Sequence, residues 1–309
     1  MNRPVFSLRA EDVDNFNPLD FYLTTDEANT WLEALADRYP EKSTVSTIGK
    51  SYEGNNINAI TINPDQTRKV ILVANLRARE WIAMSSAIYI IHELLRNSNS
   101  YPQANNFQWI IVPVPNPDGY EYTKTNDRSW CKNRVPQSYN DYGVDLDRNF
   151  AYKWEDSIRF DSNDPAAETF RGTGALSEPE TQGITDLLQY HADAYLYVDI
   201  QVFGQRIFIP WGYTEELAPN VNLLQSVAEA GASAIYAQSN QAFQVGTPAE
   251  LEEIAAGSSM DFCNSIGIKA SVTLKVSSDT YDLPPENIIP VGQEAFIAVI
   301  AMAEKAGES

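Results

Sequence analysis

The feature that most constrains the fold is a short apolar strand followed closely by a long helix. Residues 69–74 read KVILVA, an apolar and β-branched run typical of a strand buried inside a sheet. From residue 81 to residue 95, apolar side chains recur at the spacing of one helix face. Because open α/β sheets place their sites at the carboxyl ends of strands, the connecting stretch 75–82 is a candidate site. It carries Asn75, Arg77, Arg79 and Glu80, although an Arg and a Glu at this spacing are normally a surface ion pair.

Strands alternate with helices along the rest of the chain. Further strands are expected at 45–49, 57–62, 107–114, 194–202, 206–209 and 267–276. Further helices are expected from Thr24 to just before Pro40, at 178–191, at 221–237 and at 285–303. Residues 116–120 read as a tight turn and residues 246–257 as a loop. The absence of a linker predicts one α/β domain over residues 18–309, preceded by an extended arm at 1–17.

The composition excludes several classes of partner. Acidic residues outnumber basic ones by 42 to 22, giving a net charge of -20, which argues against nucleic acid and anionic membranes. No apolar run approaches the roughly 18 residues that span a bilayer. Residues 1–17 are polar and charged and do not read as a signal peptide. An acidic, soluble protein is expected.

Cysteine and histidine are scarce. Cys131 and Cys263 cannot form a disulfide framework. His92 and His191 lie on or at the end of predicted helices, far from Glu80 in sequence, and neither stands at metal-ligand spacing.

Several motifs together resemble the zinc carboxypeptidases of the A/B type. Residues 79–82, Arg-Glu-Trp-Ile, resemble the turn at which that family carries His-x-x-Glu followed by Trp-Ile. Asn-Pro-Asp-Gly at 116–119 and the segments 128–134 and 143–150 follow at the family's spacing. The resemblance spans residues 18–303 and implies a mixed eight-stranded twisted sheet flanked by helices. It also implies an extracellular zinc peptidase.

The resemblance predicts where the family's zinc ligands and catalytic residues should stand, and at most of these positions this chain carries a different residue. Arg77 and Gln201 stand at two of the three zinc-ligand positions, and only Glu80 is retained. Lys275 replaces the catalytic glutamate, and Cys131 replaces the arginine that stabilises the oxyanion. Arginine has no lone pair for a metal, and glutamine is a weak neutral donor. We therefore expect no catalytic zinc and no other cofactor.

The ligand-binding positions are changed less. Of the family's pair that holds a substrate's terminal carboxylate, the asparagine has become Asp147 while Arg148 remains. Arg79 and Arg128 also remain, and Glu253 aligns with the loop tyrosine that folds over substrate.

Met260 stands where relatives specific for basic residues carry an aspartate. A cavity over Met260, walled by Gly212, Ala255 and Thr273, would suit an apolar side chain. The alternative is a cavity that has collapsed around the flexible methionine.

Electrostatics predicts how the substitutions fit together. Without a cation, Glu80 would be a buried, unpaired carboxylate, which is costly. We expect it to pair with Arg77, Lys275 or both, while Asp147 and Glu253 balance Arg148, Arg79 and Arg128.

The leading functional hypothesis is a catalytically inactive carboxypeptidase-like protein. Its cleft would hold a peptide C-terminus or a small carboxylate, or its outer surface would bind another protein. One alternative is a residually active zinc carboxypeptidase that removes C-terminal apolar or aromatic residues. Another is chemistry by the Lys275 amine or the Cys131 thiol.

Overall fold

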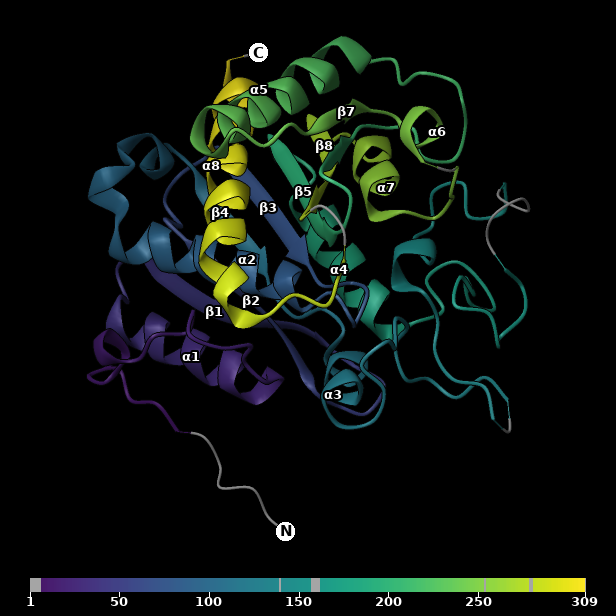
Figure 1. Cartoon of the computed structure of the whole chain (residues 1–309), viewed down its shortest axis with the longest axis horizontal. Helices are drawn as coiled ribbons and strands as arrows, with labels where there is room; N and C mark the ends of the chain where they lie inside the picture. The colour runs from purple at the N-terminus through teal and green to yellow at the C-terminus, as the bar shows by residue number, and fades with distance from the viewer. Residues whose placement is uncertain (1–6, 139, 157–161, 253, 278–279, 309) are drawn as a thin grey trace.

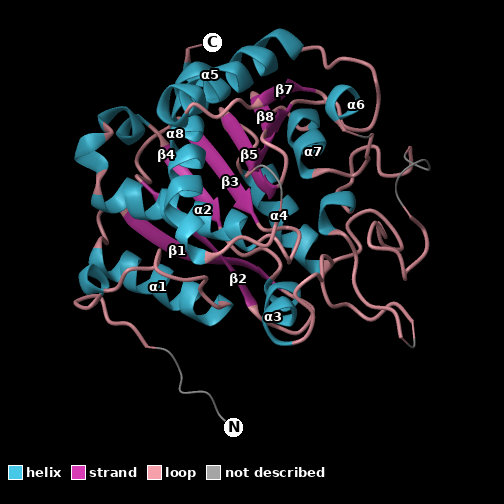
Figure 2. Cartoon of the chain, viewed as in Figure 1, coloured by secondary structure: helices cyan, strands magenta, loops and turns pink. Residues whose placement is uncertain are grey.

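An eight-stranded sheet carries helices on both faces in the computed structural model, which describes residues 7–138, 140–156, 162–252, 254–277 and 280–308 (Figures 1 and 2). The strands are β1 (Ser43–Lys50), β2 (Asn56–Ile62), β3 (Lys69–Ala74), β4 (Gln108–Val112), β5 (Leu196–Val202), β6 (Arg206–Phe208), β7 (Gln244–Gly246) and β8 (Ala270–Val276). The helices are α1 (Thr25–Arg38), α2 (Trp81–Arg96), α3 (Pro117–Thr125), α4 (Pro179–Tyr190), α5 (Val221–Ser239), α6 (Pro248–Leu251), α7 (Ser259–Ser265) and α8 (Ile288–Gly307).

The sheet is mixed, in the order β1-β2-β4-β3-β5-β8-β6-β7. Strands β4, β3, β5 and β8 run parallel at its centre. The pairs β1–β2, β2–β4 and β6–β8 are antiparallel, and β7 pairs parallel with β6 at the edge. The parallel strands are apolar and buried along their length, as strands covered on both faces must be. The predicted mixed eight-stranded α/β fold is confirmed.

Two apolar layers hold the helices onto the sheet. Helices α1, α2, α5 and α8 pack into the larger core, and α4 and α7 pack into a second core on the opposite face. Within the described residues, Pro285–Gly307 is long and apolar enough to cross a membrane, but 56% of its most apolar 18-residue window is buried. Since α8 packs against α2 and α5, it serves as a core helix, and it runs across one face of the sheet in Figure 1.

Local capping explains where the sequence prediction differs from the structure. Residues 116–120, predicted as a tight turn, instead begin α3: the Asn116 side chain accepts a hydrogen bond from the Gly119 N–H, and Pro117 occupies the first helical position. The predicted loop 246–257 contains the short helix α6. Helix α7 was not predicted, and Ser258 caps its first turn.

The amino-terminal segment is only partly extended over its described residues. A short 3₁₀ helix spans Val13–Asn15, and Val13 is fully buried in the larger core.

Candidate functional site

The turn between β3 and α2 places two candidate residues at the carboxyl edge of the sheet. Asn75 has a φ of 63°, in the left-handed region that asparagine tolerates better than most residues. Its amide donates to the carbonyl oxygens of Arg77 and Glu80, each at 3.1 Å. These bonds fix the turn, so Arg77 and Glu80 lie beside the end of β5.

A cavity of about 260 Å³ opens at the carboxyl ends of β3, β5 and β8. Arg77, Glu80, Gln201 and Lys275 line it, although they come from three separate segments of the chain. Its wall also includes Arg79, Asp145, Asp147, Arg148, Glu168, Val202, Phe203, Phe208, Gly212, Pro248, Glu252, Ala255, Met260 and Thr273. The space beside Met260 is therefore open rather than collapsed.

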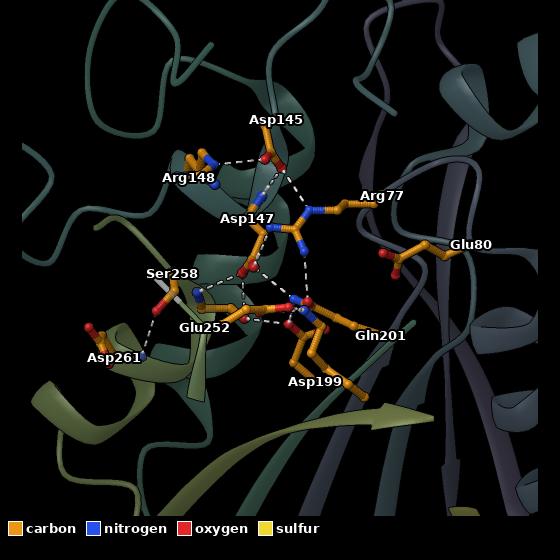
Figure 3. A network of polar contacts seen from close by, with 12 residues as sticks. Arg77, Glu80, Asp145, Asp147, Arg148, Asp199, Gln201, Glu252, Ser258 and Asp261 are labelled. Atoms are coloured by element: carbon orange, nitrogen blue, oxygen red, sulfur yellow. Dashed lines mark hydrogen bonds and ion pairs between the residues drawn. The ribbon is translucent and has the colours of Figure 1, made fainter. Parts of the chain in front are cut away.

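Arg77 lies at the centre of a polar network (Figure 3). Its Nη1 donates to Gln201 Oε1 at 2.7 Å and its Nη2 to Asp147 Oδ2 at 3.3 Å. Its Nε lies 3.6 Å from Asp145 Oδ1. A guanidinium thus bridges two buried carboxylates and one amide.

Gln201 extends this network to a further acid. Its Nε2 donates to Asp147 Oδ2 at 2.7 Å and to Asp199 Oδ2 at 2.5 Å. In the described part of the chain, the buried Asp199 Oδ1 has no hydrogen-bond partner. Burial raises the pKa of Asp199 well above its ordinary value, and nearby Asp147 raises it further. Burial and the neighbouring Asp147 therefore both disfavour the charged form of Asp199.

Glu80 stands apart from the network in Figure 3. Its Oε2 accepts a hydrogen bond from the Val202 N–H at 3.2 Å, and it forms no ion pair with any described residue. The predicted pairing with Arg77 or Lys275 is wrong, because Asp145 and Asp147 hold Arg77 and Glu252 holds Lys275. Burial raises the pKa of Glu80 to about 7, although Arg77 and Lys275 act in the opposite direction.

Lys275 is held by a carboxylate from the loop after α6. Its Nζ donates to Glu252 Oε1 at 2.8 Å and to Oε2 at 2.6 Å. Arg206 Nη1 donates to the same Oε1 at 2.9 Å. Two cations from neighbouring strands therefore share one carboxylate.

The retained arginines have partners other than those expected. Arg148 Nε pairs with Asp145 Oδ2 at 3.0 Å, so the prediction that Asp147 balances Arg148 fails: Asp147 faces Arg77. Arg79 pairs with Glu168 and Arg128 with Asp282, the latter at 3.1 Å.

Arg128 also packs against an aromatic ring, with its Cζ 3.8 Å from the centre of Trp81. It is not among the residues that line the cavity. Glu253, expected to lie over the cleft, falls outside the described residues.

Cys131 and the two histidines lie outside the cavity. Cys131 is buried and borders a separate pocket, and burial raises the pKa of its thiol, which disfavours the reactive thiolate. His92 Nδ1 lies 3.1 Å from Glu93 Oε1, and His191 is the C-cap of α4.

Sequence reasoning assigned no role to Asp145, Asp199 or Glu252. Asp199 carried a signal, because it is a charged residue inside the apolar run 194–202. Glu252 carried none, since it is one of several acids in a loop.

The polar side chains of this cavity are engaged with one another by hydrogen bonds and ion pairs. Among the described residues, no three His, Cys, Asp or Glu side chains are grouped to hold a metal ion. Asp147 and Asp199 already receive hydrogen bonds from Arg77 or Gln201, and Asp145 receives one from Arg148.

Comparison with known proteins gives consistent matches along the chain. A family model described as zinc carboxypeptidase matches residues 28–298. Carboxypeptidase B of Helicoverpa zea is 35% identical over 312 residues, covering 94% of this chain and 72% of that protein. Carboxypeptidase B of Astacus astacus is 32% identical over 293 residues, covering 91% of this chain and 96% of that protein.

Solved structures agree. Carboxypeptidase A from Helicoverpa armigera superposes with a TM-score of 0.89 at 30% identity, over 94% of this chain and 75% of that chain. Bovine thrombin-activatable fibrinolysis inhibitor, solved with a tick carboxypeptidase inhibitor, superposes with a TM-score of 0.87 at 26% identity, over 94% of this chain and 99% of that chain.

Proposed function

This chain belongs to the zinc carboxypeptidase family, and we propose that it is a member without peptidase activity. The observation that carries the proposal is the position of Arg77. At the place of a metal ligand, it makes hydrogen bonds or ion pairs with Gln201, Asp147 and Asp145. A permanently charged guanidinium at this point repels a metal cation.

The side chains present do not fit the zinc ion that the family implies. A catalytic zinc site needs three protein ligands and an open position, whereas Glu80 is the only carboxylate left at the three ligand positions. The Oε1 of Gln201 accepts from Arg77, so its best donor atom is already engaged. Bound zinc would supply a polarised water for peptide hydrolysis, and this donor set does not provide for it.

The remaining family chemistry is also altered. Lys275 and Cys131 stand at the positions of the catalytic base and of the oxyanion arginine. Removing one oxyanion donor alone typically costs roughly 10²–10³ in rate. Several such losses together support an inactive enzyme over a residually active carboxypeptidase.

A second candidate role is binding of a peptide C-terminus or a small carboxylate. The open cavity supports it, because Phe208 and Met260 offer an apolar wall beside Lys275. Binding of a protein through the outer surface is a further proposal, for which the fold alone gives no specific residue.

Chemistry by Lys275 or Cys131 has less support. The raised pKa of the buried Cys131 opposes thiolate formation. Both carboxylate oxygens of Glu252 accept hydrogen bonds from the Lys275 amine, so the amine is engaged in an ion pair, and among the described residues no other base is placed beside it to activate it as a nucleophile.

The test is a metal and activity measurement on the purified full chain. After incubation with zinc and desalting, elemental analysis is expected to find far less than one zinc per chain. Peptides ending in apolar, aromatic or basic residues are expected to stay intact. One zinc per chain, with release of C-terminal residues that a chelator abolishes, would refute the proposal.

A further inference from the structure

Glu252 links two neighbouring strands at the rim of the cavity. Lys275 on β8 and Arg206 on β6 stand directly opposite each other in the antiparallel pair. Like charges facing each other across a strand pair are destabilising. The carboxylate of Glu252 relieves this repulsion by accepting from both cations at 2.6–2.9 Å.

The two cations retain capacity for an anion. Arg206 does not line the cavity and its Nε is buried, so its Nη1, which now donates to Glu252, is the atom that would meet another carboxylate in the place of Glu252. Among the described residues, the two cations share one carboxylate, because Glu252 pairs with both. The Glu252 side chain is 36% exposed, whereas that of Lys275 is 9% exposed. The Glu252 carboxylate therefore lies on the solvent side of the pair, whereas Lys275 is part of the cavity wall.

The side chains around Lys275 indicate which chemical class of anion would fit beside it. Its Nζ lies 5.2 Å from the centre of the Phe208 ring. Phe208, Met260 and Thr273 line the same cavity as Lys275 and Glu252. A molecule whose carboxylate met Lys275 would bring the rest of its body against Phe208, which supplies apolar surface in a cavity that charged and polar side chains otherwise line in large part.

We propose that Lys275 and Arg206 form a binding site for a carboxylate with an aromatic or aliphatic body, and that Glu252 is an internal ligand which competes for it. The inference rests on the proposed function. In an active peptidase, a base would act at the position of Lys275, whereas in an inactive one this lysine is free to hold an anion. Glu252 covers the site in the absence of ligand, and an incoming carboxylate displaces it.

Competition of this kind has a measurable consequence. A ligand binds only the fraction of molecules in which the site is open, and its apparent affinity falls by that fraction. If Glu252 leaves the site open in roughly one molecule in ten, removing its charge tightens binding about tenfold.

The experiment is calorimetric titration of the full chain with N-acetylphenylalanine, with its uncharged amide, and with a tetrapeptide ending in phenylalanine. Glu252→Gln is expected to bind the acid about tenfold more tightly than the wild type. Binding of N-acetylphenylalanine alone would identify the ligand as a small acid, and binding of both acids would identify it as a peptide end. The amide is expected not to bind.

Two variants serve as controls. Glu304→Gln makes the same change of charge at an exposed position on α8 and should leave the affinity unchanged. The double variant Glu252→Gln/Lys275→Met removes both members of the Glu252–Lys275 ion pair and leaves Arg206 as the one cation of the site, and it should bind the acid much more weakly than Glu252→Gln. Circular dichroism establishes that each variant is folded.

A second readout is the rate at which acetic anhydride modifies Lys275, measured by mass spectrometry. It should rise in Glu252→Gln and fall when the acid is added. Equal affinities of the wild type and Glu252→Gln, or binding as tight in the double variant as in Glu252→Gln, would overturn the inference. Zinc or hydrolysis found in the wild type would refute the inactive enzyme instead, so the two failures are distinguishable.

Discussion

At the scale of single residues, the charges of the cavity are matched unevenly. Asp145 is buried, which by itself raises its pKa, yet Arg77 and Arg148 together hold that pKa below its ordinary value. Glu80 receives one backbone hydrogen bond and no ion pair from the described residues. The same cavity therefore stabilises one carboxylate and penalises another.

Replacing Glu80 with glutamine should stabilise the protein above neutral pH. The pKa of Glu80 is raised from 4.5 to about 7, so the folded protein favours its protonated form. The stability from this proton is full below pH 4.5 and is lost as the pH rises through about 7. Glutamine has no charge to acquire, so Glu80→Gln should exceed the wild type by roughly 3 kcal/mol at alkaline pH and match it in acid.

Urea denaturation of both proteins across this pH range measures the difference. Glu93→Gln, at a buried position on α2 outside the cavity, is the control. A less stable Glu80→Gln at alkaline pH would mean that a cation compensates Glu80 after all.

The sequence predicted which candidate residues lie together but not which of them pair. Resemblance placed Arg77, Glu80, Gln201 and Lys275 in one cleft, and all four line one cavity. Their partners depend on side chains that approach from other segments, such as Asp145 and Glu252. Ion pairing depends on distances of a few ångströms, and spacing along the chain does not specify these.

At the scale of elements, the packing of α8 depends on two glycines. An added Cβ at Gly292 would lie 2.6 Å from Cβ and 2.5 Å from Cγ of Tyr89 on α2. At Gly231 on α5 it would lie 2.9 Å from Cγ and 3.0 Å from Sδ of Met302. The two contacts differ in kind, because the start of a tyrosine side chain is fixed by the backbone whereas methionine is flexible.

Gly292→Ala should therefore destabilise the protein and Gly231→Ala should not. Alanine favours a helix by about 1 kcal/mol over glycine, but overpacking against Tyr89 costs about 1–3 kcal/mol or more. Gly231→Ala should stay within about 1 kcal/mol of the wild type, since Met302 can move aside. Urea unfolding of the two variants is the measurement, and equal losses would show that α5 and α8 are packed as rigidly as α2 and α8.

The sequence predicted the long elements better than the short ones. The helix after β3 and the buried strands have strong periodicity, and each was found within a few residues of its expected bounds. Helices α3, α6 and α7 are short and begin at side-chain caps. A cap such as Asn116 or Ser258 is also a common turn residue, so its sequence signal is ambiguous.

At the scale of the whole molecule, the family's sheet is retained, and the proposed loss of activity rests on side chains at the ends of its strands. Gln201 and Lys275 are direct partners in the β5–β8 register, and β3 pairs with β5 on the other side. The carboxyl ends of these three strands form the cavity. If the scaffold is intact, the lost ligands should be enough to restore a metal site.

The double variant Arg77→His/Gln201→His is therefore expected to bind about one zinc ion per chain, with Glu80 as the third ligand. Removing Arg77 also leaves Asp145 and Asp147 with less positive charge nearby, which favours any cation. Addition of zinc should raise the melting temperature of this variant and leave the wild type unchanged. The matched variant Arg77→Met/Gln201→Met loses the same two side chains without gaining ligands, and should not respond. A folded histidine variant that binds no zinc would mean that the carboxyl ends of β3 and β5 no longer hold the family's geometry, and that the loss of function extends from the side chains to the backbone.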